Sequence, residues 1–126
     1  MSNTTFPSTV RLRSSRDFER VYAIKCKAAD GVLLMFLARN EQAATRIGLS
    51  VSKKHGGAVE RNRLKRWLRE AFRLERHQFA PGLDLIAIPL AADRASLTAY
   101  RQSLLGLVKR LTKRLDRERE TTETPP

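Results

Sequence analysis

Two apolar stretches in the first half of the chain have the length and pattern of β-strands. Residues 32–38, VLLMFLA, form a continuous apolar run after Gly31, and its shortness favours a strand over a helix. Residues 46–52, RIGLSVS, alternate instead, with apolar side chains on one side and small or polar side chains on the other. We predict that the two strands form an antiparallel hairpin across residues 39–45.

Three other stretches repeat their apolar residues with the period of an α-helix. The first extends from about residue 15 to residue 24, after a serine that can cap its first turn. The second extends from residue 58 to about residue 77, with no helix breaker before Pro81. The third, from about residue 96 to residue 115, has the longest apolar stripe, which consists of Leu97, Tyr100, Leu104, Leu107, Val108, Leu111 and Leu115.

Two short strands complete the predicted fold. Extended pieces are expected at residues 26–28 and at residues 83–88, LDLIAI. The order αβββαβα then describes a small α+β two-layer sandwich, with three helices and one mainly antiparallel four-stranded sheet. We expect one domain at residues 11–115, flanked by disordered polar segments at residues 1–10 and 116–126.

The charge balance indicates the kind of partner. The 126 residues include 25 Lys and Arg against 13 Asp and Glu, for a formal net charge of +12. Such a charge points first to nucleic acid and second to an anionic membrane surface. No apolar run reaches the roughly 18 residues that a membrane span needs. The N-terminus lacks the apolar region of a signal peptide, and the lone Cys26 fits a reducing compartment, so we expect a cytoplasmic protein.

Most of this charge is concentrated on the predicted helix at residues 58–77. Its apolar face carries Leu64, Trp67, Leu68, Ala71 and Leu74, with Phe72 at the edge. The opposite face carries Asn62, Lys65, Arg66, Arg69, Arg73 and Arg76, with Arg61 at the margin. Like charges four residues apart repel, which favours a polyanion-binding surface over a merely solvated face. The preceding Lys53, Lys54 and Gly56-Gly57 could add a phosphate contact at the start of the helix.

Three aromatic residues are candidates for stacking against bases. Phe18 and Tyr22 lie one helical turn apart, and Phe36 lies on the strand at residues 32–38. Aromatic rings beside cations often hold single-stranded nucleic acid. The same rings could equally fill the core between the first helix and the sheet, and the sequence leaves both readings open. Trp67 is interpreted as packing at the edge of the core.

Residues suited to catalysis are scarce. His55 and His77 have no partners at the spacing of metal ligands, and we interpret Asp84 as a turn residue rather than a base. Phosphate-binding GxxxxGK[ST] and dinucleotide-binding GxGxxG motifs are absent from the sequence. Nothing in the sequence indicates that the protein itself performs a reaction.

The stretch from residue 46 to residue 73 closely resembles the protein subunit of bacterial ribonuclease P. It contains the RNR motif at Arg61-Asn62-Arg63, continued by Lys65, Arg66 and Arg69. The family's upstream L-x-x-x-x-DF pattern is matched at Leu12, Asp17 and Phe18. The resemblance extends over residues 10–115, and the central motif is highly specific.

The resemblance implies a function that the spacing alone does not show. In this family the ribozyme RNA, with Mg²⁺, hydrolyses a phosphodiester to remove the 5′ leader of precursor tRNA, and one protein assists each RNA. It also implies a left-handed crossover from the strand at residues 46–52 through the basic helix to the strand at residues 83–88. The implied surface for the ribonuclease P RNA comprises Lys53, Lys54, Arg61, Asn62, Arg63, Lys65, Arg66, Arg69 and Arg73. The implied leader-binding cleft comprises Phe18, Tyr22 and Phe36.

Three other functions remain as rivals. A structural ribosomal protein could use the same basic helix to bind RNA. A DNA-binding regulator is disfavoured because no pair of helices with a tight glycine turn precedes the basic helix. A protein-only nuclease is disfavoured because no carboxylate or metal-ligand cluster is visible in the sequence.

Overall fold

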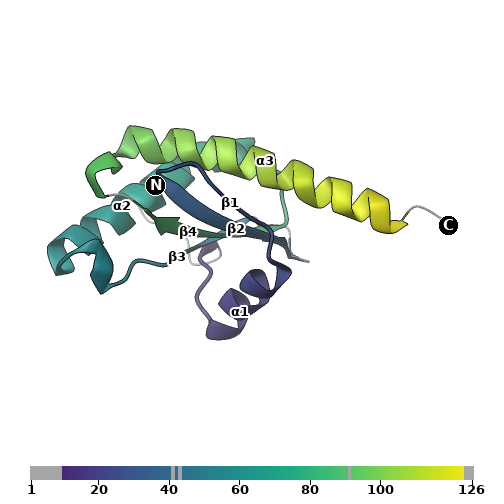
Figure 1. Cartoon of the computed structure of the whole chain (residues 1–126), viewed down its shortest axis with the longest axis horizontal. Coiled ribbons are helices and arrows are strands. Elements are labelled where there is room, and N and C mark those ends of the chain that lie inside the picture. The colour runs from purple at the N-terminus through teal and green to yellow at the C-terminus, as the bar shows by residue number, and fades with distance from the viewer. Residues whose placement is uncertain (1–9, 41, 43, 91, 124–126) are drawn as a thin grey trace, which may run out of the picture.

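The helices and strands follow one another in the predicted order. The computed structural model describes residues 10–40, 42, 44–90 and 92–123. Its elements are α1 (Ser15–Ile24), β1 (Lys27–Ala29), β2 (Leu33–Arg39), β3 (Arg46–Leu49), α2 (Ala58–Glu75), β4 (Leu83–Pro89) and α3 (Leu97–Glu123) (Figure 1). Short 3-10 turns lie at η2 (Lys53–His55), η3 (Arg76–Gln78) and η4 (Ala92–Arg94). Three helices with one four-stranded mixed sheet confirm the predicted α+β fold.

The strand order differs from the predicted hairpin. The order is β1-β2-β4-β3, in which β2 pairs with β4 antiparallel and β3 pairs with β4 parallel. The hairpin between residues 32–38 and 46–52 is therefore wrong, because β4 lies between these strands. All residues of β4 except Ile88 are buried, and a strand that is buried on both faces belongs in the centre of a sheet. The β3–α2–β4 connection is a parallel crossover, and its left hand stays a prediction from the resemblance.

Two layers of side chains cover the sheet on opposite faces. On one face, α2 and α3 pack against each other, α3 also against β1 and β2 and α2 against β3, around a core that includes Phe72 and Tyr100, both fully buried. On the other face, α1 contacts β2 and β4 through a smaller cluster of Leu12, Val21, Ala38 and Ile86. Figure 1 shows α3 and α1 on opposite sides of the strands.

The ends of the domain extend beyond the predicted limits. Val10 is buried, and the Leu12 N–H donates a hydrogen bond of 2.8 Å to Ile47 O, so residues 10–12 follow the edge of β3. At the other end α3 continues to Glu123, so residues 116–123 are helical where we predicted disorder. An ion pair between Arg39 and Asp116 accompanies this extension. The remaining predicted disorder, at residues 1–9 and 124–126, lies outside the described residues.

Candidate nucleic-acid interface

His55 fixes the turn that precedes α2 through hydrogen bonds from its ring. The Ser52 N–H donates to His55 Nδ1 at 2.9 Å, so the ring hydrogen lies on Nε2, which is 2.8 Å from Pro89 O. His55 thereby fastens the turn η2 to the end of β4. Gly56, with φ of 120°, then redirects the chain into α2, a backbone conformation that suits glycine. Lys53 and Lys54 are left exposed just before the helix.

The basic face of α2 is open to solvent along its first three turns. Asn62, Arg63 and Arg66 are exposed, and Arg61, Lys65 and Arg69 are half-buried. The Arg63 guanidinium lies 5.2 Å from the centre of the Trp67 ring, a cation–π contact. Trp67 also packs edge-on against Tyr100, with ring centres 6.5 Å apart, so it joins the core to the basic face.

Arg73 differs from the other cations on the basic face of α2, which we call the basic stripe (Arg61, Lys65, Arg66, Arg69, Arg73 and Arg76). Its Nε and a terminal nitrogen donate to the Glu70 carboxylate at 2.9 and 2.5 Å. The hydrogen bond and charge of Arg73 lower the pKa of Glu70 below its usual value. We predicted that the cations at positions 61, 65, 69 and 73 repel one another. Arg73 takes little part in this repulsion, because Glu70, three residues earlier, neutralises its charge.

Two arginines that our candidate set omitted lie beside the basic stripe. Arg11 and Arg13 line a hollow of about 200 Å³ together with Lys65 and Arg69. Burial and the charge of Arg11 lower the pKa of Arg69, as expected where cations gather. The missed signal is the alternation VRLR at residues 10–13, in which Val10 and Leu12 are buried and the two arginines alternate with them.

The three candidate aromatic residues form one contiguous group. Phe18, Tyr22 and Phe36 are each half-buried. Ring centres lie 6.3 Å apart for Phe18 and Tyr22, and 4.8 Å apart for Tyr22 and Phe36. Lys27 Nζ lies 5.7 Å from the centre of the Phe36 ring. The rings pack on the small cluster under α1 and keep part of their surface exposed, so neither of our two readings describes them alone.

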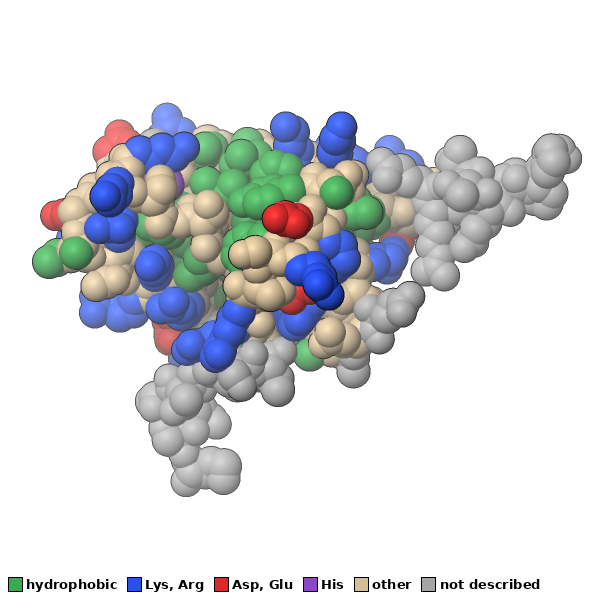
Figure 2. All heavy atoms as spheres, turned by 90° about the horizontal axis from the view of Figure 1, so that it is seen from below, with side chains coloured by type: hydrophobic (Ala, Val, Ile, Leu, Met, Phe, Trp, Pro, Cys, Tyr) green, Lys and Arg blue, Asp and Glu red, His purple; other side chains and the backbone are tan. Residues whose placement is uncertain are grey.

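The aromatic group and the basic hollow adjoin each other. Leu12 packs in the cluster with the Phe18 ring and also lines the hollow. A Cβ on Gly48 of β3 would lie 2.5 Å from Phe18 Cζ, so the glycine allows α1 to approach the sheet closely. Figure 2 shows the side of the molecule that carries α1, with hydrophobic side chains bordered by Lys and Arg. Stacking and charge are thus available on one continuous surface.

Asp84 anchors the elements that form this surface. Its carboxylate is fully buried and accepts hydrogen bonds from Arg46 at 2.8 and 2.7 Å and from Asn40 at 2.7 Å. Arg20 of α1 also contacts it, so one carboxylate joins α1, β3 and the end of β2. Burial alone would raise the pKa of Asp84, but these hydrogen bonds and positive charges together lower it. The interpretation of Asp84 as a turn residue is therefore wrong, because tertiary folding places it among three partners.

Comparison with known proteins identifies the family. A family model for Ribonuclease P matches residues 6–112. The chain belongs to the Ribonuclease P family. A "Ribonuclease P protein component" of Brevibacillus brevis is 42% identical over 102 residues, which cover 79% of this chain and 81% of the relative. One from Finegoldia magna is 46% identical over 81 residues, covering 64% and 71%.

Solved structures of Ribonuclease P proteins share the fold. The protein from Thermotoga maritima superposes with a TM-score of 0.71 at 32% identity, covering 79% of this chain and 96% of that one. The protein from Staphylococcus aureus gives a TM-score of 0.70 at 32% identity, covering 79% and 93%. The α+β architecture is therefore that of Ribonuclease P proteins.

The part of the chain that the structure describes contains neither a candidate metal centre nor a candidate membrane span. Across residues 10–40, 42, 44–90 and 92–123, no group of three or more His, Cys, Asp and Glu side chains could hold a metal ion. Within the same ranges, no helix combines the length and the apolar character needed to cross a membrane.

Proposed function

We propose that this chain is the protein cofactor of the ribonuclease P ribozyme in the cytoplasm. It binds the catalytic RNA through the basic face of α2 and the 5′ leader of precursor tRNA on the aromatic group under α1. The RNA subunit, with Mg²⁺, hydrolyses the phosphodiester, and one protein serves each RNA. The ribonuclease P RNA and precursor tRNA are thus its two partners.

Family membership supports the general role. As a Ribonuclease P protein component, the chain takes part in tRNA 5′ processing within a ribonuclease holoenzyme. The observation that carries the finer proposal is the basic face of α2, where Arg61, Asn62 and Arg63 begin a run of cations. Among the described residues, Arg73 is the only cation of this face that pairs with an acidic side chain, so the others are available for phosphates.

The aromatic group supports a separate role for the α1 side. Its rings are partly exposed and Lys27 lies beside them, which suits an unpaired strand whose bases stack without sequence preference. Leaders differ in sequence, so recognition by stacking and charge is appropriate. The adjoining hollow with Arg11 and Arg13 offers phosphate contacts between this strand and α2.

Reconstitution tests the proposal. We expect the purified protein, freed of RNA, to leave precursor tRNA intact, and the ribonuclease P RNA to cleave at high Mg²⁺ alone and at low Mg²⁺ only with the protein. The protein's cations can stand in for the extra metal because both screen phosphate repulsion. Cleavage by the protein alone would contradict the division of labour. Co-purification with intact ribosomal subunits instead of the ribozyme RNA would favour the structural ribosomal alternative.

A further inference from the structure

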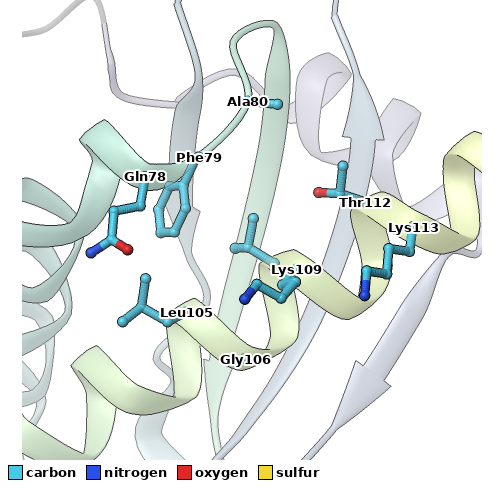
Figure 3. A pocket seen from close by; sticks show the side chains of 9 residues that line it. Gln78, Phe79, Ala80, Leu105, Gly106, Lys109, Thr112 and Lys113 are labelled. Atoms are coloured by element: carbon cyan, nitrogen blue, oxygen red, sulfur yellow. The ribbon is translucent and has the colours of Figure 1, made fainter.

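An apolar groove lies on the side of the sheet away from α1. It separates residues 78–80, which follow α2, from the middle of α3 and has a volume of about 470 Å³ (Figure 3). Phe79 and Leu105 point toward each other across it, and Lys109 and Lys113 project from α3 along its border. None of these residues belongs to the surfaces described above.

Gly106 indicates that the groove is kept open. It lies in the middle of α3, where glycine lowers helix stability relative to alanine. A Cβ at this position would meet no atom within 4 Å, so packing within the chain does not require glycine. The effect of the missing side chain is to leave room in the groove.

The polar groups of the groove suit an anion with a flat apolar part. Thr112 Oγ1 is buried without a hydrogen-bond partner and belongs to a residue that lines the groove. Lys109 and Lys113 are exposed one helical turn apart, and neither has an acidic partner among the described residues. An unpaired nucleotide suits the apolar walls, the lysines and Thr112: its base lies between Phe79 and Leu105, its phosphates lie at the lysines, and its polar atoms can hydrogen-bond to Thr112 Oγ1.

The groove also adjoins a second hollow at the end of α2. Beyond the last turn of α2, Arg76 and His77 line this hollow of about 380 Å³, and Phe79 lines both hollows. A strand that follows the basic face past Glu75 would therefore meet Arg76, then the Phe79 ring, then Lys109. An acidic peptide could match the lysines, but cations in two adjoining hollows, Arg76 in one and Lys109 and Lys113 in the other, suit a polymer that is anionic at every unit.

We propose that this groove binds an unpaired nucleotide of the ribonuclease P RNA, as a second contact on the α3 side. The inference rests on the proposed function, which assigns the RNA subunit to α2 and the leader to the opposite face of the sheet. Precursor tRNA is therefore not the expected occupant.

Filling the groove tests the proposal. Gly106→Leu should weaken binding of the ribonuclease P RNA about tenfold in a filter-binding titration, because its side chain occupies the space of the base. The melting temperature should not fall, since leucine favours a helix more than glycine does. The matched control is Gln102→Leu, which places the same side chain on an exposed position of α3 outside the groove and should bind as the parent does.

A charge variant gives an independent measurement. Lys109→Ala with Lys113→Ala should lower the logarithmic salt dependence of RNA binding by about 0.7 to 0.9 for each lost phosphate contact. Unchanged affinity in Gly106→Leu together with an unchanged slope here would overturn the groove proposal. If Arg66→Ala on α2 still weakens binding, the proposed function survives that result; if it does not, the proposed function fails as well.

The remaining outcomes identify other occupants. A loss of affinity confined to precursor tRNA, measured with the assembled holoenzyme, would assign the groove to substrate and overturn the proposal. Capture of an acidic amphipathic test peptide by the parent but not by Gly106→Leu, with equal RNA binding, would assign it to a protein partner and overturn it too.

Discussion

Replacing Asp84 by asparagine should lower the free energy of unfolding by about 3 to 5 kcal/mol, the cost of breaking a buried ion pair. Asparagine keeps the size of the side chain but removes the charge that faces Arg46 and Arg20. The Arg46 side chain is only 12% exposed, so water cannot replace the lost carboxylate around it. A loss of this size is a large share of the 5 to 15 kcal/mol that is typical for domain stability.

Urea denaturation followed by circular dichroism measures this loss. The matched control is Asp116→Asn, which breaks the exposed pair with Arg39 and should cost less than about 1 kcal/mol. Equal and small effects of both substitutions would refute the idea that Asp84 anchors α1, β3 and β2.

The pH dependence of stability provides a second test of the role of Asp84. The pKa of Asp84 is lowered from 3.8 in the folded protein, so its ionised form stabilises the fold above that value. This contribution is lost as the pH falls through the lowered pKa, when the folded carboxylate takes up a proton. The stability difference between the parent and Asp84→Asn should therefore be constant near neutral pH and shrink below about pH 4. A difference that stayed constant into that acid range would contradict the assignment.

Two further predictions concern RNA. Lys65→Ala or Arg69→Ala should lower the logarithmic salt dependence of binding to the ribonuclease P RNA by about 0.7 to 0.9. Arg73→Ala should change it less, because Glu70 already neutralises Arg73. The same salt dependence in all variants and in the parent would show that the basic face of α2 does not contact the RNA. Tyr22→Leu or Phe36→Leu keeps most of the apolar volume but removes the ring, so precursor tRNA should bind the holoenzyme more weakly by roughly 1 to 3 kcal/mol per stacked base, with mature tRNA unchanged. Equal losses for both tRNAs, or a large fall in melting temperature, would show that the rings serve only the fold.

Local patterns in the sequence determined the elements and the character of the basic helix. The bounds of α1 and the start of α2 were predicted correctly because caps, glycines and a period of 3.6 residues act over a few neighbouring positions. The pairing of Arg73 with Glu70 is equally local, since the acid lies three residues before the base, but we had counted Arg73 among the repelling cations. The RNR motif, too, lies in one continuous segment, so the family could be identified without a structure.

Only the tertiary structure decided which segments meet. The central place of β4 depends on burial of both its faces, and an apolar run such as residues 83–88 does not by itself name its neighbours. The same packing brings Arg11 against Arg69 and encloses Asp84, although these partners lie far apart along the chain. Residues 116–123 are polar, so no periodic stripe marked them as helix, yet α3 continues through them. Long-range pairing is a property of the assembled chain: local periodicity indicates which face of an element is buried, but not which distant segment covers it.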